Sequence, residues 1–313
     1  MRSWLLLFAC NLMWALQFTC IKLVQDQVGP LFTVWAPMTL ALAALYPWMK
    51  VEWKRAEANP HGLERREGRP NMVRLYLLLA VGGVLPGQLF MTWGTRISLA
   101  SNAAVINLTL PVATAVFAFL FLGERLTPVR WVSFAIAILG VLLCSGVDLR
   151  GLNFGAGYLW GNLLIFAATL GSAFYNSYGK KALVWHTPME MLFYTYVAVC
   201  ALMAPVVLLQ EGAVFGRIPH FTLNTWIGLA LLTMFHNYLS MILFLKALKD
   251  LDATQAALSN YLVTVFGGPI AAIWLGERLT APAIAGGVMV LAGTLLITLW
   301  KGRAGTPAAT TGE

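Results

Sequence analysis

Ten stretches of mostly apolar residues follow one another along the chain, each long enough to cross a membrane as a helix. About 20 such residues are needed, because an α-helix rises about 1.5 Å per residue through a hydrocarbon core about 30 Å thick. The pattern therefore predicts an all-α integral membrane protein of about ten transmembrane helices. The predicted spans are 3–24, 31–49, 73–94, 101–122, 128–147, 156–178, 188–209, 223–245, 254–275 and 281–300.

The connections between these stretches are mostly short, so consecutive helices are expected to be antiparallel neighbours. The exception is the segment 50–72, which is rich in Arg and Glu. The last residues, 303–313, are small and polar, and we expect a disordered cytoplasmic tail there.

The composition also indicates a membrane protein. Hydrophobic residues make up 59% of the chain and charged residues only 11%, whereas a soluble domain has about 25% charged residues. The net charge of +8 sits in short loops between apolar spans rather than along one face, so no nucleic-acid partner is expected. The four cysteines lie inside apolar runs without metal-binding spacing. Neither a disulfide nor a metal or other cofactor is therefore expected.

One hexapeptide occurs twice in the chain. Leu-Gly-Glu-Arg-Leu-Thr at 122–127 returns at 275–280, 153 residues later (275 − 122), which indicates an internal repeat. We therefore expect two five-helix halves, 1–150 and 151–302. Further pairs at the same offset are Asn107 with Asn260 and Gly140 with Gly293.

Each copy of the hexapeptide has the residues of a sharp turn between two helices. Gly123 and Gly276 suit the left-handed residue that ends a helix, and the threonine that closes each copy suits the N-cap of the next helix. The neighbouring charged residues are expected to fix the reversal, by a local ion pair or by hydrogen bonds to helix ends. Contact with a solute is the alternative. These charged residues are Glu124, Arg125, Glu277 and Arg278.

Lysine and arginine set the expected orientation, because cytoplasmic loops carry an excess of positive charge. With the N-terminus in the cytoplasm, most of the 21 lysines and arginines fall on the cytoplasmic side, and the C-terminus lies there too. Five helices per half is an odd number, so the second half crosses the membrane in the opposite sense. Such inverted repeats are typical of secondary transporters, whose substrate site lies near the midplane. The loop charges and the lack of a transit peptide favour a bacterial inner (plasma) membrane.

These features resemble the drug/metabolite transporter superfamily, and its EamA-like branch in particular. The resemblance rests on two halves of five helices, each with Gly-Glu-Arg-Leu-Thr between the fourth and fifth helix. A polar and aromatic run in helix 1 that ends in Lys22, with a counterpart that ends in Lys180, matches as well. One departure is Trp14-Ala15, where that branch often has Trp-Gly. The resemblance implies export or exchange of small metabolites through a cavity lined mainly by helices 1, 3, 4, 6, 8 and 9, and it names no substrate.

Polar residues recur on single faces of two otherwise apolar helices. On helix 4, Asn107, Pro111 and Thr114 are three or four residues apart and share a face. On helix 9, Asn260 and Thr264 do the same. A polar stripe inside a membrane faces protein or water rather than lipid. It can contact a solute, or it can join helices through hydrogen bonds worth about 0.6–2 kcal/mol each.

Helices 3 and 8 carry a second group of residues at matching depth. Pro86 predicts a kink in helix 3, and Gln88 follows it. Helix 8 carries His236, Asn237 and Tyr238 at that depth, where they can meet a solute. The glycines beside Pro86 either let helix 3 bend or let it pack closely against a neighbour.

Helices 1 and 6 supply amide and aromatic groups. Asn11, Trp14 and Gln17 lie three residues apart on one face of helix 1, and Tyr175 and Asn176 lie on helix 6. Trp14 and Tyr175 can stack on an apolar or aromatic solute or cover a cation. The predicted substrate-binding residues together are Asn11, Trp14, Gln17, Gln88, Asn107, Thr114, Tyr175, Asn176, His236, Asn237, Tyr238, Asn260 and Thr264. The predicted hinge and structural residues are Pro86, Pro111, Pro269, Gly123, Gly276, Glu124, Arg125, Glu277 and Arg278.

No acidic or basic residue lies near the centre of a predicted span. Proton coupling normally needs such a group, and His236 is the one candidate, an interior hydrogen-bonded histidine being the alternative. The sequence predicts a secondary transporter that moves a small organic metabolite (amino-acid-like, drug-like or related) by alternating access, in efflux or exchange. Its partners are the solute and the lipid bilayer, and a homodimer is left open. An enzyme is not expected. The alternatives are an integral-membrane enzyme acting on lipid or isoprenoid groups and a receptor or scaffold without transport.

Overall fold

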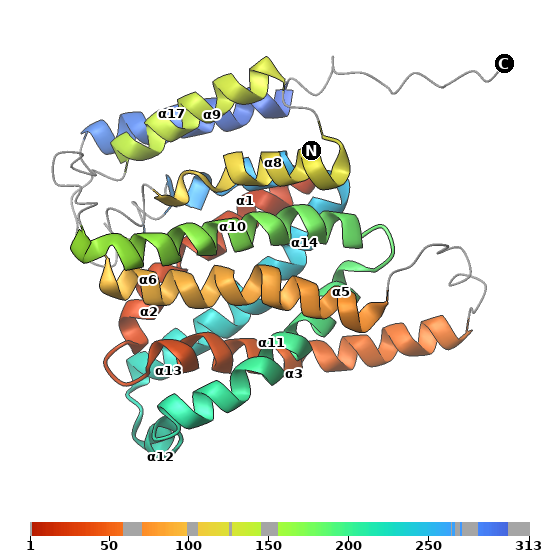
Figure 1. The fold of residues 1–313 in the computed structure, drawn as a ribbon, viewed down its shortest axis with the longest axis vertical. Coiled ribbons are helices and arrows are strands. Elements are labelled where there is room, and N and C mark those ends of the chain that lie inside the picture. The colour runs from red at the N-terminus through yellow and green to blue at the C-terminus, as the bar shows by residue number, and fades with distance from the viewer. Residues whose placement is uncertain are drawn as a thin grey trace.

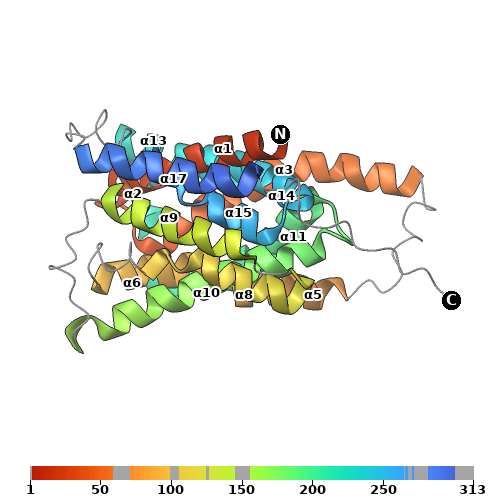
Figure 2. The ribbon, with the colours of Figure 1, turned by 90° about the horizontal axis from the view of Figure 1, so that it is seen from above.

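The computed structural model describes residues 2–58, 71–98, 106–124, 127–144, 156–263, 265–266, 270 and 281–299. Within these residues the chain forms a bundle of helices, most of which run roughly along one direction (Figure 1 and Figure 2). In this described part of the chain, four helices are long and apolar enough to cross a bilayer by length and composition: Pro30–Lys54, Met72–Gly94, Pro188–Glu211 and Leu223–Asp250.

Every predicted span contains helix within its described residues, and the predicted all-α membrane fold is confirmed. The first half contains α1 (Arg2–Ala15), α2 (Gln17–Val24), α3 (Pro30–Ala58), α5 (Met72–Leu79), η1 (Ala80–Val84), η2 (Pro86–Phe90), α6 (Met91–Ile97), α8 (Leu110–Leu122) and α9 (Pro128–Cys144). The second half contains η3 (Ala156–Tyr158), α10 (Leu159–Ala182), α11 (Pro188–Glu211), α12 (Val214–Arg217), η4 (Ile218–His220), α13 (Leu223–Leu231), η5 (Leu232–Leu239), α14 (Ser240–Asp250), α15 (Ala253–Ser259) and α17 (Ala281–Leu299).

Helix α3 continues to Ala58, beyond the predicted end at 49. The apolar pattern marks the part inside the bilayer, whereas the charged residues that follow are good helix formers and extend the same helix. Two contacts hold this extension. Trp53 Nε1 donates to the Tyr194 hydroxyl at 3.1 Å. The Thr187 hydroxyl donates to the Glu52 carboxylate, also at 3.1 Å.

Helices 3 and 8 both change to π-helix near their middle. In helix 3 the segments η1 and η2 follow α5, and in helix 8 the segment η5 follows α13. Pro86 begins η2, because proline has no N–H to continue the α-helical hydrogen bonding. π-Turns are rare and often occur at functional sites. Because both helices contain them, the two halves are alike at the depth of Gln88 in helix 3 and His236 in helix 8, which the sequence predicted as site residues.

Equivalent glycines of the two halves make equivalent contacts. A methyl group on Gly140 of α9 would come within 2.7 Å of the carbonyl oxygen of Gly286 in α17. One on Gly293 of α17 would come within 3.2 Å of the carbonyl oxygen of Ser133 in α9. Each contact is the other shifted by the repeat offset, so α9 and α17 pack around a pseudo-two-fold axis. The two helices lie side by side at one edge of the bundle (Figure 1).

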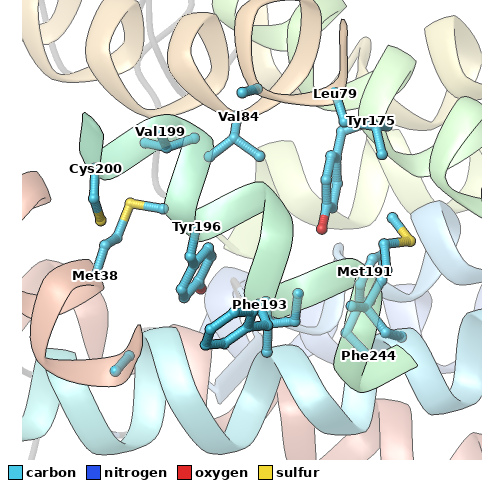
Figure 3. Close-up of a cluster of buried hydrophobic side chains, with 14 of the residues drawn as sticks. Met38, Leu79, Val84, Tyr175, Met191, Phe193, Tyr196, Val199, Cys200 and Phe244 are labelled. Carbon is cyan, nitrogen blue, oxygen red and sulfur yellow. The ribbon is translucent and has the colours of Figure 1, made fainter. Parts of the chain in front are cut away.

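Large side chains from both halves fill the centre of the bundle (Figure 3). Tyr196 of α11, Phe244 of α14 and Met38 of α3 are almost fully buried there. In a bilayer the surroundings are as apolar as the core, so close packing and hydrogen bonds hold the helices together. Large apolar side chains such as Trp160 and Leu209 cover the outside of the bundle, where they suit contact with lipid. The chain is a multi-pass integral membrane protein.

Candidate functional site

Helices 4 and 9 are both interrupted where they meet. A turn at 108–109 precedes α8, and a turn at 260–261 follows α15. Residues 108 and 261 are 153 apart, which is the repeat offset, and the Tyr261 hydroxyl donates to the Leu108 carbonyl oxygen at 2.8 Å. A contact between two equivalent residues lies on the pseudo-two-fold axis. Interrupted helices at such a place are where carriers build substrate sites.

Asn11 of α1 reaches this interruption. Its Nδ2 donates to the Leu7 carbonyl oxygen at 2.7 Å and to the Ser259 hydroxyl oxygen at 3.0 Å. The side chain is fully buried, yet its Oδ1 has no hydrogen-bond partner in the described part of the chain. The Oδ1 of Asn260, the residue after Ser259, has none there either. Two amide oxygens are therefore available as acceptors beside the interruption.

Trp14, one turn further along α1, faces helix 8. Its ring centre lies 5.2 Å from that of Phe244 and 6.5 Å from that of His236. The indole Nε1 and the His236 Nδ1 are both buried and have no partner among the described residues. Asn237 beside His236 is turned back on its own helix, because its Nδ2 donates to the Leu232 carbonyl oxygen at 3.0 Å. The Asn237 amide group therefore donates within helix 8, whereas the Nδ1 atom of His236 remains available.

Tyr175 of α10 extends into the central cluster, with its hydroxyl at the inner end of the side chain (Figure 3). Gly83 of η1 allows this packing, because a Cβ there would lie 2.9 Å from the Cβ of Tyr175. The Tyr175 hydroxyl is buried without a partner among the described residues. The neighbouring Tyr196 differs, since its hydroxyl donates to the Asn237 carbonyl oxygen at 2.8 Å. Tyr196 therefore joins α11 to η5 by a hydrogen bond, whereas the Tyr175 hydroxyl remains available.

Thr114 of α8 completes the group. The Ser177 hydroxyl of α10 donates to its carbonyl oxygen at 3.0 Å and joins helices 4 and 6. The Thr114 Oγ1 is buried and has no partner among the described residues.

These unpartnered atoms belong to five helices drawn from both halves. We call them the central site, and its residues are Asn11, Trp14, Thr114, Tyr175, His236 and Asn260. Native proteins leave few buried polar atoms unpaired, because each costs about 1–3 kcal/mol. None of the six residues is an aspartate, glutamate, lysine or arginine. The arrangement can thus donate to and accept from an uncharged or zwitterionic molecule.

The other predicted site residues have different positions. Asn176 is buried, while Gln17, Gln88 and Tyr238 are partly buried. Asn107 is exposed, and the continuous polar face predicted for helix 4 is wrong because the turn at 108–109 interrupts the helix. Pro111 accordingly lies in the first turn of α8. Outside the described residues lie Arg125, Thr264, Pro269, Gly276, Glu277 and Arg278.

Three contributors to this region were not predicted from the sequence: Ser177, Ser259 and Tyr196. Ser259 directly precedes Asn260, which was a usable signal. Tyr196 lies in a mostly apolar span, where nothing in the spacing distinguishes it from an ordinary core tyrosine.

A groove of about 250 Å³ beside Pro86 is a separate surface. It lies between α3, the π segments of helix 3 and α11, and its walls are apolar side chains such as Leu31, Leu85 and Met203. Such a surface suits lipid chains rather than a polar solute.

Known proteins share this sequence pattern and fold. The sequence model of the EamA-like transporter family matches residues 1–146 and 159–299. A probable terminal-alkyne amino-acid exporter of Streptantibioticus cattleyicolor is 26% identical over 286 residues, which cover 91% of this chain and 89% of that one. An S-adenosylmethionine uptake transporter of Rickettsia bellii is 28% identical over 214 residues, 67% of this chain and 68% of that one. A solved crystal structure has the same fold, with a TM-score of 0.75 at 17% identity over 97% of this chain and 99% of that one. The chain belongs to the EamA-like transporter family.

Proposed function

We propose that this transporter moves a small, amino-acid-like zwitterion by alternating access between its two halves, in export or exchange. The observation that carries the proposal is the central site, where buried donors and acceptors from both halves have no partner among the described residues. A zwitterion has a carboxylate that accepts hydrogen bonds and an ammonium group that donates them. Trp14 Nε1 and the Tyr175 hydroxyl fit the first, and the amide oxygens of Asn11 and Asn260 fit the second.

The lack of charge at the central site favours a solute without net charge. An isolated ion in the membrane interior is costly unless a protein charge pairs with it. A zwitterion brings its own opposite charge, so polar side chains and aromatic faces suffice. The names of the two relatives agree with this class, since one names an amino acid and the other a derivative of methionine.

The proposal includes the orientation and the membrane. Because most lysines and arginines fall on the side of the N-terminus, we place that side in the cytoplasm of a bacterial cell. We expect movement to be driven by the gradient of the solute or by exchange, because the central site has no aspartate or glutamate and His236 is its one candidate for coupling a proton.

Counterflow in proteoliposomes tests the proposal. Purified protein is reconstituted with an unlabelled amino acid inside, and uptake of each of a panel of labelled amino acids is measured. We expect counterflow for at least one, with Tyr175→Phe weakening half-saturation about tenfold because one hydrogen bond to a charged group is lost. Tyr194→Phe is the matched control, since the Tyr194 hydroxyl contacts Trp53 away from the central site. Absence of counterflow for amino acids alongside transport of a solute with net charge would contradict the proposal.

A further inference from the structure

A second polar cluster joins the two halves at the end of the bundle that carries the N-terminus. Ser3 marks this end, because its hydroxyl donates to the Asp250 carboxylate at 2.9 Å. Glu124 lies there directly after Gly123, whose φ of 68° turns the chain back at the end of α8. The sequence predicted that Glu124 fixes the reversal through a local ion pair or through hydrogen bonds to helix ends, and the structure places its hydrogen-bond donors at the start of a helix in the other half.

The donors belong to the first turn of α15. The Glu124 carboxylate accepts from the Ala253 N–H at 2.8 Å, from the Thr254 N–H at 3.3 Å and from the Thr254 hydroxyl at 2.9 Å. These groups would otherwise be unpaired, because the first N–H groups of a helix have no partner within it. The side chain of Glu124 is 10% exposed. A buried carboxylate of the first half thus holds the start of helix 9 in the second.

Arg130 of α9 ties the same helices together by charge. Its Nη1 lies 3.6 Å from the Glu124 carboxylate, and its Nη2 donates to the Asp252 carboxylate at the start of α15. Its side chain is 12% exposed, so solvent screens its pairing with Glu124 less than its pairing with Asp252, whose side chain is 40% exposed. The repeat offset relates Arg130 to Ala283 and Asp252 to Leu99, so the sequence does not repeat this ion pair in the other half.

Lys180 holds the turn before α15 from its other side. Its Nζ donates to the carbonyl oxygen of Leu248 at 2.9 Å and to that of Leu251. Lys180 places a cation at the C-terminal end of α14, and Glu124 places an anion at the N-terminal end of α15. Both charges are stabilising, because each is opposite in sign to the helix dipole at that end. The turn between helices 8 and 9 is therefore held by charged groups from helix 6 and from the first half.

We infer that Glu124, Arg130 and Asp252 form a latch that closes the N-terminal end of the solute path and must open once in each transport cycle. This inference rests on the proposed function. Helices 4 and 9, which the latch joins, pack side by side and carry Thr114 and Asn260 of the central site. Separation of these helices at the N-terminal end would open a route to that site, and it requires Glu124 to leave Ala253 and Thr254. Glu124 is a positioning residue in this account, because it touches no solute.

Accessibility of one cysteine from each side of the membrane tests the latch. The four native cysteines are replaced by alanine, and Thr114→Cys is the reporter inside the central site. A membrane-impermeant maleimide is applied to right-side-out and inverted vesicles, whose orientation is assigned by protease access to an N-terminal tag. We expect Glu124→Gln to raise the labelling rate from the N-terminal side about tenfold relative to that from the opposite side, because it weakens charge-assisted hydrogen bonds.

Glu211→Gln is the matched control. The Glu211 carboxylate accepts from the Leu31 and Phe32 N–H groups at the start of α3, at the opposite end of the bundle. It makes the same kind of contact as Glu124, so this variant should not raise labelling from the N-terminal side. If Glu124→Gln fails to fold, Asp252→Asn removes only the partly exposed carboxylate and should shift the ratio of labelling rates in the same direction.

The inference is overturned if Glu124→Gln and Asp252→Asn lower the thermal unfolding temperature but leave the ratio of labelling rates unchanged, or reverse it. Labelling needs no solute, so its outcome is independent of the counterflow result. Intact counterflow with an unchanged ratio refutes the latch alone, whereas a shifted ratio without counterflow refutes the proposed solute class alone.

Discussion

The central site and the latch are both polar clusters between the two halves, but they differ in whether their polar atoms have partners within the chain. In the latch, the Glu124 carboxylate meets two N–H groups, a hydroxyl and a guanidinium. In the central site, the Trp14 indole and the Tyr175 hydroxyl have no partner among the described residues. The chain itself supplies the partners of the latch, so its contacts stabilise the closed conformation described here. In the central site, several polar atoms have no partner among the described residues, and a bound molecule can supply one.

This difference predicts that stability and solute affinity can be changed separately. Substitutions in the latch should act on the stability and shape of the protein. Substitutions in the central site should act on solute binding while leaving the unfolding temperature nearly unchanged.

The largest expected effect is that of Arg130→Ala. It leaves the carboxylates of Glu124 and Asp252 close together without their shared cation, and we expect the protein to lose about 2–3 kcal/mol of stability. Thermal unfolding in detergent measures the loss. Arg130→Lys retains a charge and should lose less. An unfolding temperature equal to that of the wild type would show that the ion pair does not hold the halves together.

The next effect compares two equivalent asparagines. Asn260→Ala removes an amide oxygen that has no partner among the described residues, so we expect solute affinity to fall about tenfold with stability within about 0.5 kcal/mol of wild type. Asn107→Ala at the equivalent but exposed position should have a smaller effect on affinity. Half-saturation in counterflow measures both variants. Equal losses, or loss of folded Asn260→Ala protein, would support helix–helix joining in place of solute contact.

Smaller effects on stability and solute affinity are expected for the hydroxyl groups of Ser177 in helix 6 and Thr114 in helix 4. Ser177→Ala removes a hydrogen bond to the Thr114 carbonyl oxygen and should cost about 1 kcal/mol of stability without changing solute affinity. Thr114→Val removes a hydroxyl that has no partner among the described residues, so it should leave stability unchanged and weaken solute binding. Unfolding temperature and solute binding are measured on both variants. A loss of solute affinity in Ser177→Ala together with a loss of stability in Thr114→Val would contradict the distinction between partnered and unpartnered polar atoms.

The smallest expected effect is that of the proton gradient. Since the central site has no carboxylate, we expect a protonophore to leave counterflow unchanged in both wild type and His236→Gln. Transport that stopped with the protonophore, and a dependence that vanished in His236→Gln, would show proton coupling through this histidine.

Much of the fold could be predicted because membrane spans and internal repeats can be recognised from short stretches of sequence. The apolar runs located the helices, and the repeated hexapeptide located a turn in which Gly123 adopts the left-handed conformation. Pro86 located the irregular part of helix 3 because proline removes a backbone donor.

The site could be predicted only in part, because partners and interruptions depend on packing between distant segments. Trp14 and His236 were predicted and lie near each other, but their lack of partners is visible only in three dimensions. The interruption in helix 9 falls at Asn260 and Tyr261, which carry no helix-breaking signal, and a contact between the halves accompanies it. The donors to Glu124 lie 129 and 130 residues away, beyond the reach of local patterns.

Equilibrium binding to the double variant Trp14→Phe/Tyr175→Phe tests the central claim most directly. The two changes remove the indole and phenol donors and keep an aromatic ring at each position. With the solute identified by counterflow, the account predicts a dissociation constant about 100-fold higher than that of wild type, at an unchanged unfolding temperature. A dissociation constant equal to that of wild type would show that the solute binds elsewhere and would contradict the account.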